Sequence, residues 1–471
     1  MENYNLSNYS IFIELEKSDN QYMALHGYTG AVDILGEEIV IYLKNNKNNL
    51  DATSFPFSKN TWNALVNRGY ITRKSEEEER KHVIKLANLL QRRNILLHQY
   101  FTFLITYDCN FRCPYCYEAN LSNHGLSWSK KVFTKEMVDK AYLAIDHIEK
   151  KEEYRSNTIL LYGGEPLLKE NRDIIEYIVN NGNKRGFVFN AITNGYDLEF
   201  YADLLSKNKI KFLQITLDGM EESHNKRRKH FNGKDTFDKV FNNIILALNK
   251  GIHVNIRINT DANNIEEISL IKKMINERGI SDYNNLHITS ALLVDYLHTD
   301  KECSIKEKYD LENDLNYLPY IEFVKKHKSM DLDIQFDDKG TYKLLYNAIK
   351  YKQKMHLKST YCAAQHGSYT LDPYGNIFSC LESIGFPNER IGKYDGENVK
   401  WEPVLSKWRS RNSGNLERCS RCKFTFMCKG GCTNQILKRG GDFTDSICEG
   451  YDSILKISAN MVYDKLFLNI E

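Results

Sequence analysis

The sequence has no long hydrophobic run. No stretch of 18 apolar residues occurs in its 471 residues, and residues 1–10 are polar, without a basic segment followed by an apolar one. A chain of this kind offers neither a membrane-spanning helix nor a secretion signal. We therefore expect a cytoplasmic protein that has no membrane partner.

The sequence also lacks an excess of either charge. Its formal net charge is +2, although 27% of the residues are charged. Such a balance gives no long-range attraction to a polyanion, so we do not expect nucleic acid as a partner. The length exceeds what one hydrophobic core usually supports, and about two to four domains are expected.

The eleven cysteines are unevenly distributed, and none occurs before Cys109. In a reducing compartment, cysteines in an odd number and in clusters are better explained as metal ligands or catalysts than as disulfides. The first cluster is Cys109, Cys113 and Cys116, with C-x3-C-x2-C spacing directly after the apolar run Phe101 to Ile105. Three thiols can hold an iron-sulfur cube and leave its fourth iron open, whereas an electron-transfer cluster normally takes four cysteines. The alternatives are incidental cysteines or a zinc knuckle, which needs four ligands.

With Tyr115 before its last cysteine, this triplet resembles the signature of radical S-adenosylmethionine (SAM) enzymes. The resemblance implies that SAM chelates the open iron. One electron then cleaves SAM to methionine and a 5'-deoxyadenosyl radical, which takes a hydrogen atom from the substrate. It assigns Cys109, Cys113 and Cys116 to catalysis as well as to metal binding.

From about residue 100 to 290, apolar strands alternate with amphipathic helices, a pattern that indicates parallel βα units and an α/β fold. Six strands match the partial (β/α)6 barrel of the family, which we assign to residues 98–300. Functional residues lie at the carboxyl ends of such strands. The expected strands are Phe101 to Thr106, Thr158 to Tyr162, Gly186 to Thr193, Phe212 to Leu217, His253 to Asn259 and Leu286 to Ser290.

Polar motifs follow these strands and resemble the SAM-binding motifs of the family. In the GGEP motif, glycines allow close approach to a ligand, and the carboxylate can accept hydrogen bonds from the SAM ammonium. A tight turn or helix caps are the alternatives. The SAM contacts that the resemblance implies are Tyr115, Gly163, Gly164, Glu165, Pro166, Thr193, Asn194, Thr216, Asp218, Arg228 and Arg257.

Arg228 closes a segment, from Glu222 onward, that resembles the H-D-x-x-R segment of the family. Asn225 stands where an aspartate is common, which leaves the role of its side chain open. The basic run Lys226 to His230 is interpreted as a solvated surface or a loop near SAM, because no stacking aromatics are interleaved with it.

Residues 1–95 are predicted to form a separate module. Three short strands (Ser10 to Leu15, Tyr22 to His26, Ala31 to Leu35) and three helices (Glu37 to Lys44, Lys59 to Arg68, Glu76 to about Arg92) look like a winged-helix fold. In peptide-modifying radical SAM enzymes, such a module resembles the element that binds a leader peptide as an added strand. The alternative is a docking or oligomerisation appendage.

Residues 359–471 carry seven more cysteines and resemble the SPASM domain, which holds auxiliary clusters. By position, one cluster has four ligands (Cys419, Cys422, Cys428, Cys448) and another has three (Cys362, Cys380, Cys432). The fourth ligand of the latter is Cys303, another side chain or a substrate thiolate. The implied cofactors are therefore SAM and three [4Fe-4S] clusters, with zinc as the alternative for four of these positions.

Three smaller elements complete the prediction. A helical connector over residues 301–358 includes Ile305 to Leu315 and Tyr342 to Met355, and its Cys303 is a small core residue or a ligand. A β-hairpin surrounds Gly375 and ends near Cys380, and a helix over Ser453 to Leu468 packs on the barrel. Glu382 is either a proton acceptor or a surface carboxylate.

The N-terminal module, the partial barrel and the SPASM-like domain together resemble maturases of ribosomally made peptides. We expect a thioether bond between a peptide cysteine and a substrate carbon, a precursor peptide whose leader binds the N-terminal module, and flavodoxin or ferredoxin as electron donor. The alternatives are a carbon-carbon crosslink, formylglycine formation as in anaerobic sulfatase maturation, and tRNA modification. A non-enzymatic iron-sulfur carrier or a zinc-bound adaptor is the alternative from another class.

Overall fold

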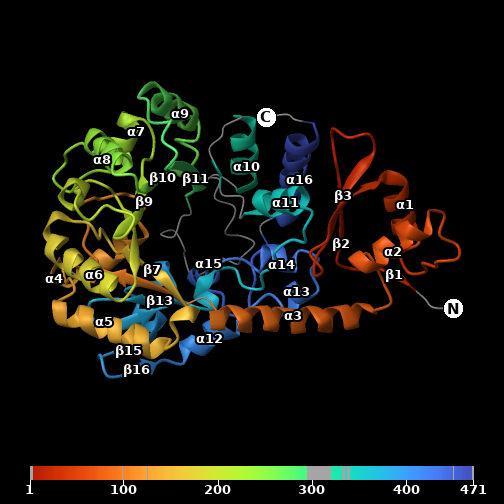
Figure 1. Ribbon diagram of the computed structural model, residues 1–471, viewed down its shortest axis with the longest axis horizontal. Helices are drawn as coiled ribbons and strands as arrows, with labels where there is room; N and C mark the ends of the chain where they lie inside the picture. Colours follow the sequence, from red (N-terminus) through yellow and green to blue (C-terminus); the bar gives the residue numbers. More distant parts are fainter. Residues whose placement is uncertain are drawn as a thin grey trace.

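The computed structural model describes residues 4–97, 99–124, 126–293, 320–330, 335–336, 340–448 and 450–468. Its main feature is an eleven-stranded sheet with the order β12-β11-β10-β9-β8-β7-β6-β13-β14-β15-β16. The sheet and its helices fill one end of the molecule, and the N-terminal elements lie at the other end (Figure 1). Cys303 and the predicted helix from Ile305 to Leu315 lie outside the described residues.

Six neighbouring strands of this sheet are parallel, as predicted. Each is mostly apolar, and along β8 buried residues alternate with less buried ones, because successive side chains of a strand point to opposite faces. The six strands are β6 (Gln99–Leu104), β7 (Arg155–Tyr162), β8 (Val188–Thr193), β9 (Ile210–Thr216), β10 (His253–Thr260) and β11 (Leu286–Leu292).

Amphipathic helices between these strands cover the sheet and form one large core with it. In α6, for example, Ile175, Ile178 and Val179 are fully buried, and burying a side chain of this size contributes about 1.5–3 kcal/mol. The α/β fold class is confirmed. The four long covering helices are α5 (Lys135–Ile148), α6 (Arg172–Lys184), α8 (Phe237–Asn249) and α9 (Glu267–Glu277).

The sheet extends beyond the six predicted barrel strands at both sides. Strand β12 (Gln335–Phe336) pairs with β11, and β13 (Ser368–Leu371) pairs in parallel with β6. Antiparallel partners then follow: β14 (Asn376–Phe378), β15 (Arg390–Tyr394) and β16 (Val399–Trp401). The predicted hairpin around Gly375 is therefore present as β13 and β14, and it is joined to the first strand of the barrel.

The N-terminal part has the predicted strands and helices in the predicted order. Strands β2 (Ser10–Glu14), β3 (Gln21–His26) and β4 (Val32–Gly36) form an antiparallel sheet. Two shorter strands, β1 (Asn5–Leu6) and β5 (Ile71–Thr72), pair with each other and were not predicted. The helices are α1 (Glu37–Asn45), α2 (Lys59–Arg68) and α3 (Glu76–Leu97).

The C-terminal helix α16 (Tyr451–Phe467) packs mainly on α11 (Thr341–Lys350), with further contacts to the N-terminal sheet, which corrects the prediction that it lies on the barrel. Ile454, Leu455 and Val462 are buried with side chains of β2, β3 and α11. Ile457 does contact the barrel core. Helix α11 ends at Lys350, before the predicted end at Met355. Figure 1 shows α16 and α11 between the N-terminal strands and the barrel.

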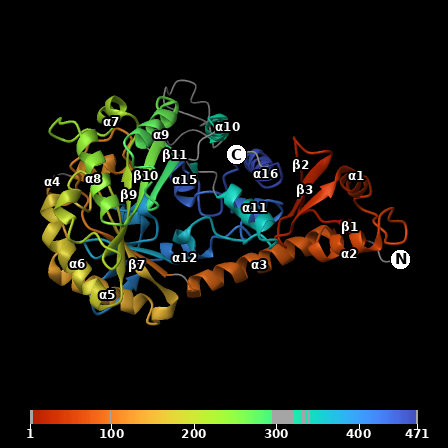
Figure 2. The same ribbon diagram turned by 45° about the horizontal axis from the view of Figure 1, so that its top comes forward.

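Helix α3 runs along one side of the molecule, from the N-terminal part to the barrel (Figures 1 and 2). Gln91 on this helix donates through Nε2 to the carbonyl oxygens of Gln365 and Arg411, both at 3.0 Å, and its Oε1 accepts from Asn412 at 2.7 Å. Ala87 packs against Gly414, where a Cβ would lie 2.5 Å from the Ala87 methyl group. The first and last parts of the chain thus share one interface.

The remaining helices are short or lie at the edges of the fold. No helix in the described part of the chain is long and apolar enough to cross a bilayer. These helices are α4 (Leu126–Ser129), α7 (Glu221–Arg227), α10 (Tyr320–Ser329), α12 (Val404–Ser410), α13 (Glu417–Ser420), α14 (Thr425–Cys428) and α15 (Thr433–Lys438).

We predict that Gln91→Ala destabilises the protein by about 1–3 kcal/mol, because it leaves two buried carbonyls and an amide without their partner. Chemical denaturation followed by circular dichroism measures the change. Leu89→Ala on the same helix is the control, since Leu89 is 53% exposed, and should change stability by less than about 0.5 kcal/mol. Equal effects of the two substitutions would contradict the assigned interface.

Candidate active site

The cysteine triplet lies in the loop that follows β6. Burial, and then the charges of Glu165 and Cys113, raise the pKa of the Cys109 thiol well above its ordinary value. Burial, and then Glu118 and Cys113, raise the pKa of Cys116 to about 12. The N–H of Phe111 donates to the Cys109 sulfur at 3.3 Å. The three thiols are therefore close enough to act on one another.

Three cysteines in one loop are a donor set that fits an iron-sulfur cluster, because such clusters are held by cysteine thiolates. Binding to iron also favours the thiolate, which removes the cost that burial imposes on these thiols as free anions.

The GGEP motif packs directly against the cysteine loop. The N–H of Gly164 donates to the Thr106 carbonyl at 2.9 Å, and that of Glu165 donates to the Asp108 carbonyl at 2.8 Å. At Gly163, with φ +142°, a Cβ would lie 2.3 Å from the Thr106 oxygen. Glycine is required here because the backbone approaches too closely for any side chain.

The Glu165 carboxylate is held by the chain itself. It accepts from the Leu167 N–H at 2.9 Å, the Thr193 hydroxyl at 2.6 Å and the Asn194 N–H at 2.6 Å. Burial raises its pKa to about 7 although these hydrogen bonds oppose the shift. Three of about four acceptor positions are thus filled, and the residue joins the ends of β7 and β8. Its contact with SAM stays a prediction.

Asn194 connects this part of the site to the cysteine loop. Its Nδ2 donates to Asn110 Oδ1 at 2.7 Å and lies 3.9 Å from the Cys109 sulfur. The N–H of Tyr196 donates to its Oδ1 at 2.9 Å. The side chain therefore positions the loop, and its predicted contact with SAM is not tested by this geometry.

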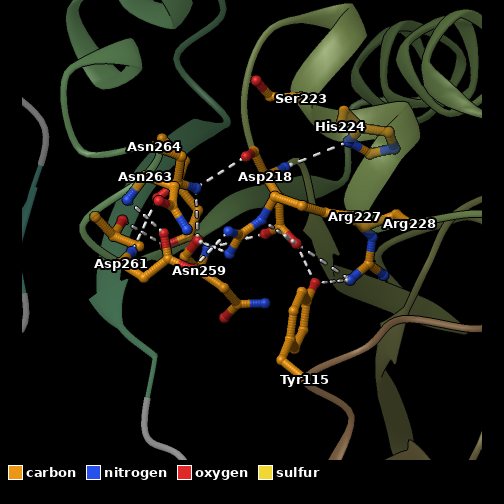
Figure 3. A network of polar contacts seen from close by, with 12 residues as sticks. Tyr115, Asp218, Ser223, His224, Arg227, Arg228, Asn259, Asp261, Asn263 and Asn264 are labelled. Atoms are coloured by element: carbon orange, nitrogen blue, oxygen red, sulfur yellow. Dashed lines mark hydrogen bonds and ion pairs between the residues drawn. The ribbon is translucent and has the colours of Figure 1, made fainter. Parts of the chain in front are cut away.

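Asp218, after β9, is the centre of a buried polar network (Figure 3). It is fully buried and accepts from the Tyr115 hydroxyl, while the Asn259 N–H donates to its Oδ1 at 3.0 Å. Arg228 Nη1 donates to the Tyr115 oxygen at 2.7 Å and lies 3.7 Å from Asp218 Oδ2. The network joins the cysteine loop to the end of β9 and to β10, and the predicted contacts of these residues with SAM stay predictions.

The segment that resembles H-D-x-x-R has a structural role for its first two positions. His224 Nδ1 accepts from the Asp218 N–H at 3.3 Å, and burial, followed by Arg228 and Arg227, lowers the His224 pKa well below its ordinary value. Asn225 Oδ1 accepts from the N–H groups of Thr236 and Phe237 at 2.9 and 3.0 Å. Asn225 thus supplies the acceptor at the start of α8 that an aspartate would supply.

The remaining predicted SAM contacts are near this network. Thr216 is the last residue of β9 and pairs with Arg257 of β10. Arg257 Nε donates to Asn259 Oδ1 at 2.9 Å. Pro166 follows Glu165, and its carbonyl accepts from Asn171 at 3.2 Å. The ligand contacts of all three residues stay predictions.

Two further groups of cysteines gather in the C-terminal part. Burial raises the pKa of Cys362 to about 11, with Cys432 and Glu382 among the other causes, and the pKa of Cys380 is raised by burial and then Cys362 and Glu382. Burial raises the pKa of Cys419 to about 11 as well, with Cys428, Cys422 and Cys448 contributing. Cys362, Cys380 and Cys432 thus influence one another, as do Cys419, Cys422, Cys428 and Cys448, and their roles as cluster ligands stay predictions.

Glu382 lies beside the set of three and is not a free surface carboxylate. Its Oε2 accepts from Asn434 Nδ2 at 3.0 Å, and its backbone carbonyl accepts from Lys438 Nζ at 3.3 Å. Since Asn434 is two residues after Cys432, this bond connects the segments that carry two of the three cysteines. A role as proton acceptor stays a prediction.

Sequence analysis missed three residues between the two cysteine sites. Glu118 is 8% exposed, and burial raises its pKa to about 7. Its Oε1 accepts from the Tyr117 hydroxyl at 2.8 Å, and Oε2 has no partner in the described part of the chain. The Tyr117 and Tyr162 hydroxyls are 2.6 Å apart. The only sequence signal was position: Glu118 follows Cys116 by two residues, and Tyr162 precedes GGEP.

The fold and these motifs define an α/β enzyme with cysteine-rich metal sites, and the comparisons give its family. Residues 103–274 match the model of the radical SAM superfamily. The chain therefore carries a radical SAM domain over these residues, and this family uses SAM and a [4Fe-4S] cluster.

Two relatives extend the match beyond this domain. A cysteine-type anaerobic sulfatase-maturating enzyme from Clostridium perfringens is 24% identical over 341 residues, 69% of this chain and 85% of the relative. The radical SAM cyclopropyl synthase TigE from Paramaledivibacter caminithermalis is 23% identical over 457 residues, 91% of this chain and 89% of the relative.

One solved structure shares the fold. Native anSMEcpe with bound AdoMet superimposes with a TM-score of 0.56 and 18% identity, over 79% of this chain and 98% of that chain. At this identity the likeness supports the arrangement of strands and helices only.

We predict that Asn225→Ala lowers the free energy of unfolding by about 1 kcal/mol, the usual effect of removing an acceptor at a helix start. Asn225→Asp is the matched variant. It keeps the oxygen and adds a negative charge near the helix N-terminus, so it should retain stability. Urea denaturation of both variants tests this, and a loss of stability in Asn225→Asp as large as in Asn225→Ala would contradict the capping role.

Proposed function

We propose that this radical SAM enzyme is a maturase that modifies a ribosomally made precursor peptide. The observation that carries the proposal is the position of the cysteine set Cys362, Cys380 and Cys432 next to the cysteine triplet. The Tyr117 hydroxyl, one residue after Cys116, lies 3.4 Å from the Leu381 carbonyl, one residue after Cys380. A substrate between these loops is within reach of both sites.

In the proposed site, Cys109, Cys113 and Cys116 hold a [4Fe-4S] cluster, and the GGEP, Thr193, Asn194, Thr216, Asp218, Arg228 and Arg257 positions hold SAM. When bound, these groups supply a carbon radical that abstracts hydrogen. Asp218 positions Tyr115 through its hydroxyl, and Glu165 fixes the ends of two strands. The buried Asp218 carboxylate lies 3.7 Å from the buried Arg228 guanidinium. Removal of either side chain would leave the other as an uncompensated charge.

The proposed auxiliary sites are the C-terminal cysteine sets. Cys419, Cys422, Cys428 and Cys448 would fill four positions of one cluster, and the set of three would leave one position open on the other. A peptide thiol bound there would be deprotonated and oriented. This vacancy favours thioether formation, in which the peptide sulfur joins the carbon that has lost its hydrogen.

The N-terminal sheet is the proposed leader-binding element. The His26 N–H donates to the Ala31 carbonyl, so these two residues form a hydrogen-bonded pair. Hydrogen-bonded and non-hydrogen-bonded pairs alternate along an antiparallel ladder. The pair of Met23 and Ile34 is therefore non-hydrogen-bonded, and the N–H and C=O of Ile34 point away from β3. At the outer edge of β2, the Glu14 carbonyl already accepts from Asn460 Nδ2 at 3.4 Å. On the β4 edge the Val32 carbonyl accepts from Arg68 Nη2 at 2.8 Å, so we place the added peptide strand at the Ile34 end of β4.

A carbon-carbon bond is the second candidate product. TigE is named a cyclopropyl synthase and aligns with 91% of this chain, including the N-terminal part. The sulfatase-maturating relative, whose match covers 69% of the chain, favours formylglycine formation instead. Flavodoxin or ferredoxin as the electron donor stays a prediction, as does a cytoplasmic location.

We predict that the reconstituted enzyme, with SAM and dithionite, removes two hydrogen atoms from a cysteine-bearing precursor peptide encoded beside its gene. Mass spectrometry after iodoacetamide treatment is the measurement. A thioether consumes one thiol, so one fewer cysteine is alkylated, whereas a carbon-carbon bond leaves every thiol free. No mass change in such a peptide, alongside turnover of the Cp18Cys peptide that is bound in a structure of anSMEcpe, would contradict the proposal.

We also predict that Ile34→Pro weakens binding of the precursor peptide about tenfold, the effect of losing one backbone hydrogen bond of about 1.4 kcal/mol. Proline removes the outward N–H and leaves the ladder to β3 intact, which is tolerated on an edge strand. Ile34→Ala is the matched control, because it loses the side chain but keeps the N–H. Fluorescence anisotropy measures the affinity, and equal binding by the two variants would count against the β4 edge.

A further inference from the structure

The C-terminal part of the chain contains a buried arginine, Arg411, directly after α12. It is 2% exposed, which makes it the most buried arginine or lysine among the described residues. In that part of the chain, no carboxylate oxygen lies within 4.0 Å of its guanidinium. A guanidinium keeps its charge in a protein, and a buried charge without a close partner is costly. The position of Arg411 therefore requires an explanation.

The guanidinium is held by backbone carbonyls of two segments that carry cysteines. Arg411 Nη2 donates to the Gly430 carbonyl at 3.4 Å, and Nη1 donates to the Phe443 carbonyl. The Nε of Arg411 is buried and has no partner in the described residues. Bonds to neutral carbonyls do not neutralise a charge, so the compensating negative charge comes from other groups.

Gly430 lies close to the set of four cysteines. A Cβ at Gly430 would lie 3.4 Å from the Cys419 sulfur. The N–H of Ile447, the residue before Cys448, donates to the Gly430 carbonyl at 3.2 Å. The oxygen that binds Arg411 therefore lies where segments that carry these cysteines meet.

The arginine is also connected to the set of three cysteines. Cys432 lies two residues after the glycine whose carbonyl binds the guanidinium. The Arg411 carbonyl accepts from Gln91 Nε2, which also donates to the carbonyl of Gln365, three residues after Cys362. The backbone of Arg411 is thus tied to the segment of one cysteine set and its side chain to the segments of the other.

The charges that act on the guanidinium agree with this placement. Burial lowers the pKa of Arg411, and the negative groups that oppose this shift are, in order of size, Cys419, Asp445, Cys432 and Asp442. Neither aspartate lies within 4.0 Å, and Asp442 is exposed. Water and salt screen an exposed charge, whereas a cysteine that holds iron stays ionised. One cysteine of each set is therefore among the groups that compensate Arg411.

We propose that Arg411 is the shared counter-charge of the two C-terminal cysteine sets and favours the reduced state of the iron-sulfur groups that they hold. This inference rests on the proposed auxiliary sites and deepens them by naming a side chain that sets their reduction potentials. An iron-sulfur group gains one negative charge when it takes up an electron. A fixed cation nearby stabilises that charge and raises the potential.

Such a counter-charge suits the proposed thioether reaction. A carbon radical brings one electron to the new C–S bond and a thiolate brings two, so one electron is released. By then the 5'-deoxyadenosyl radical has taken the hydrogen atom of that carbon, and the thiol has lost its proton on binding. The released electron reduces an auxiliary site by one, and the buried charge of Arg411 makes this reduction more favourable.

The test is a redox titration of the reconstituted holoenzyme, followed by electron paramagnetic resonance. Arg411→Gln and Arg411→Met both remove the charge, and only glutamine keeps a donor for the Gly430 carbonyl. We expect both to lower the auxiliary midpoint potentials, with the reduction equilibrium weakened about tenfold or more, about 59 mV for one electron. The triplet's cluster, recognised because SAM changes its signal, should keep its potential and serves as the internal reference.

Arg418→Gln is the matched control. It removes the same charge one residue before Cys419, but Arg418 is exposed, so the auxiliary potentials should shift less than about twofold in equilibrium. Arg411→Lys keeps a charge without the planar fork and should stay within about threefold of the wild type. If only the hydrogen bond mattered, Arg411→Gln would stay close to the wild type and Arg411→Met would not, which would overturn the proposal.

Iron analysis separates this inference from the function on which it rests. With about twelve irons per chain, unchanged auxiliary potentials in Arg411→Gln and Arg411→Met overturn the role of Arg411 alone, and so does an equal shift in Arg418→Gln. If both charge-removing variants lose auxiliary iron, Arg411→Lys decides. Potentials like those of the wild type support the proposal, and loss of iron from this variant as well overturns it. About four irons in the wild type would overturn the auxiliary sites themselves.

Discussion

The parallel pairing of β13 with β6 is the constraint on which the site depends. It places Tyr369 beside Phe101 and Leu371 beside Phe103, and so joins the hairpin of β13 and β14, which leads to the loop that carries Cys380, to the strand that leads to the cysteine triplet. Gly385, in the latter loop, approaches so closely that a Cβ would lie 2.7 Å from Leu121. Two cysteine sites separated by more than 240 residues in the sequence are thereby attached to one sheet.

Buried carboxylates then organise the polar part of the site, each with a different balance of burial and bonding. Asp218 is bonded to a tyrosine and lies near two arginines, so its charge is compensated. Glu165 accepts three hydrogen bonds, yet burial still raises its pKa to about 7. Glu118 accepts one and has an oxygen without a partner in the described residues. In a low-dielectric site an unpaired oxygen is costly, which makes Glu118 the carboxylate best able to gain from a bound ligand.

Local sequence patterns predicted the strands and helices of the α/β domain well, because strand alternation and helix periodicity are short-range properties. Long-range packing was not predictable. Nothing in Ser453 to Leu468 indicates that its apolar face packs on α11 and the N-terminal strands rather than on the barrel, and nothing near Gly375 shows that its hairpin extends the barrel sheet. The roles of Glu165 and Asn225 were also hidden, since a carboxylate or amide in a motif can bind ligand or its own backbone equally well.

The central claim is that three iron-sulfur sites lie in this one chain, two of them at adjoining loops. Iron analysis of the reconstituted protein, paired with Mössbauer spectroscopy, tests it most directly. We predict about twelve irons per chain, all in four-iron clusters, and a loss of about four in Cys380→Ala with the other sites retained. About four irons in the wild-type protein, unchanged in Cys380→Ala, would contradict the account.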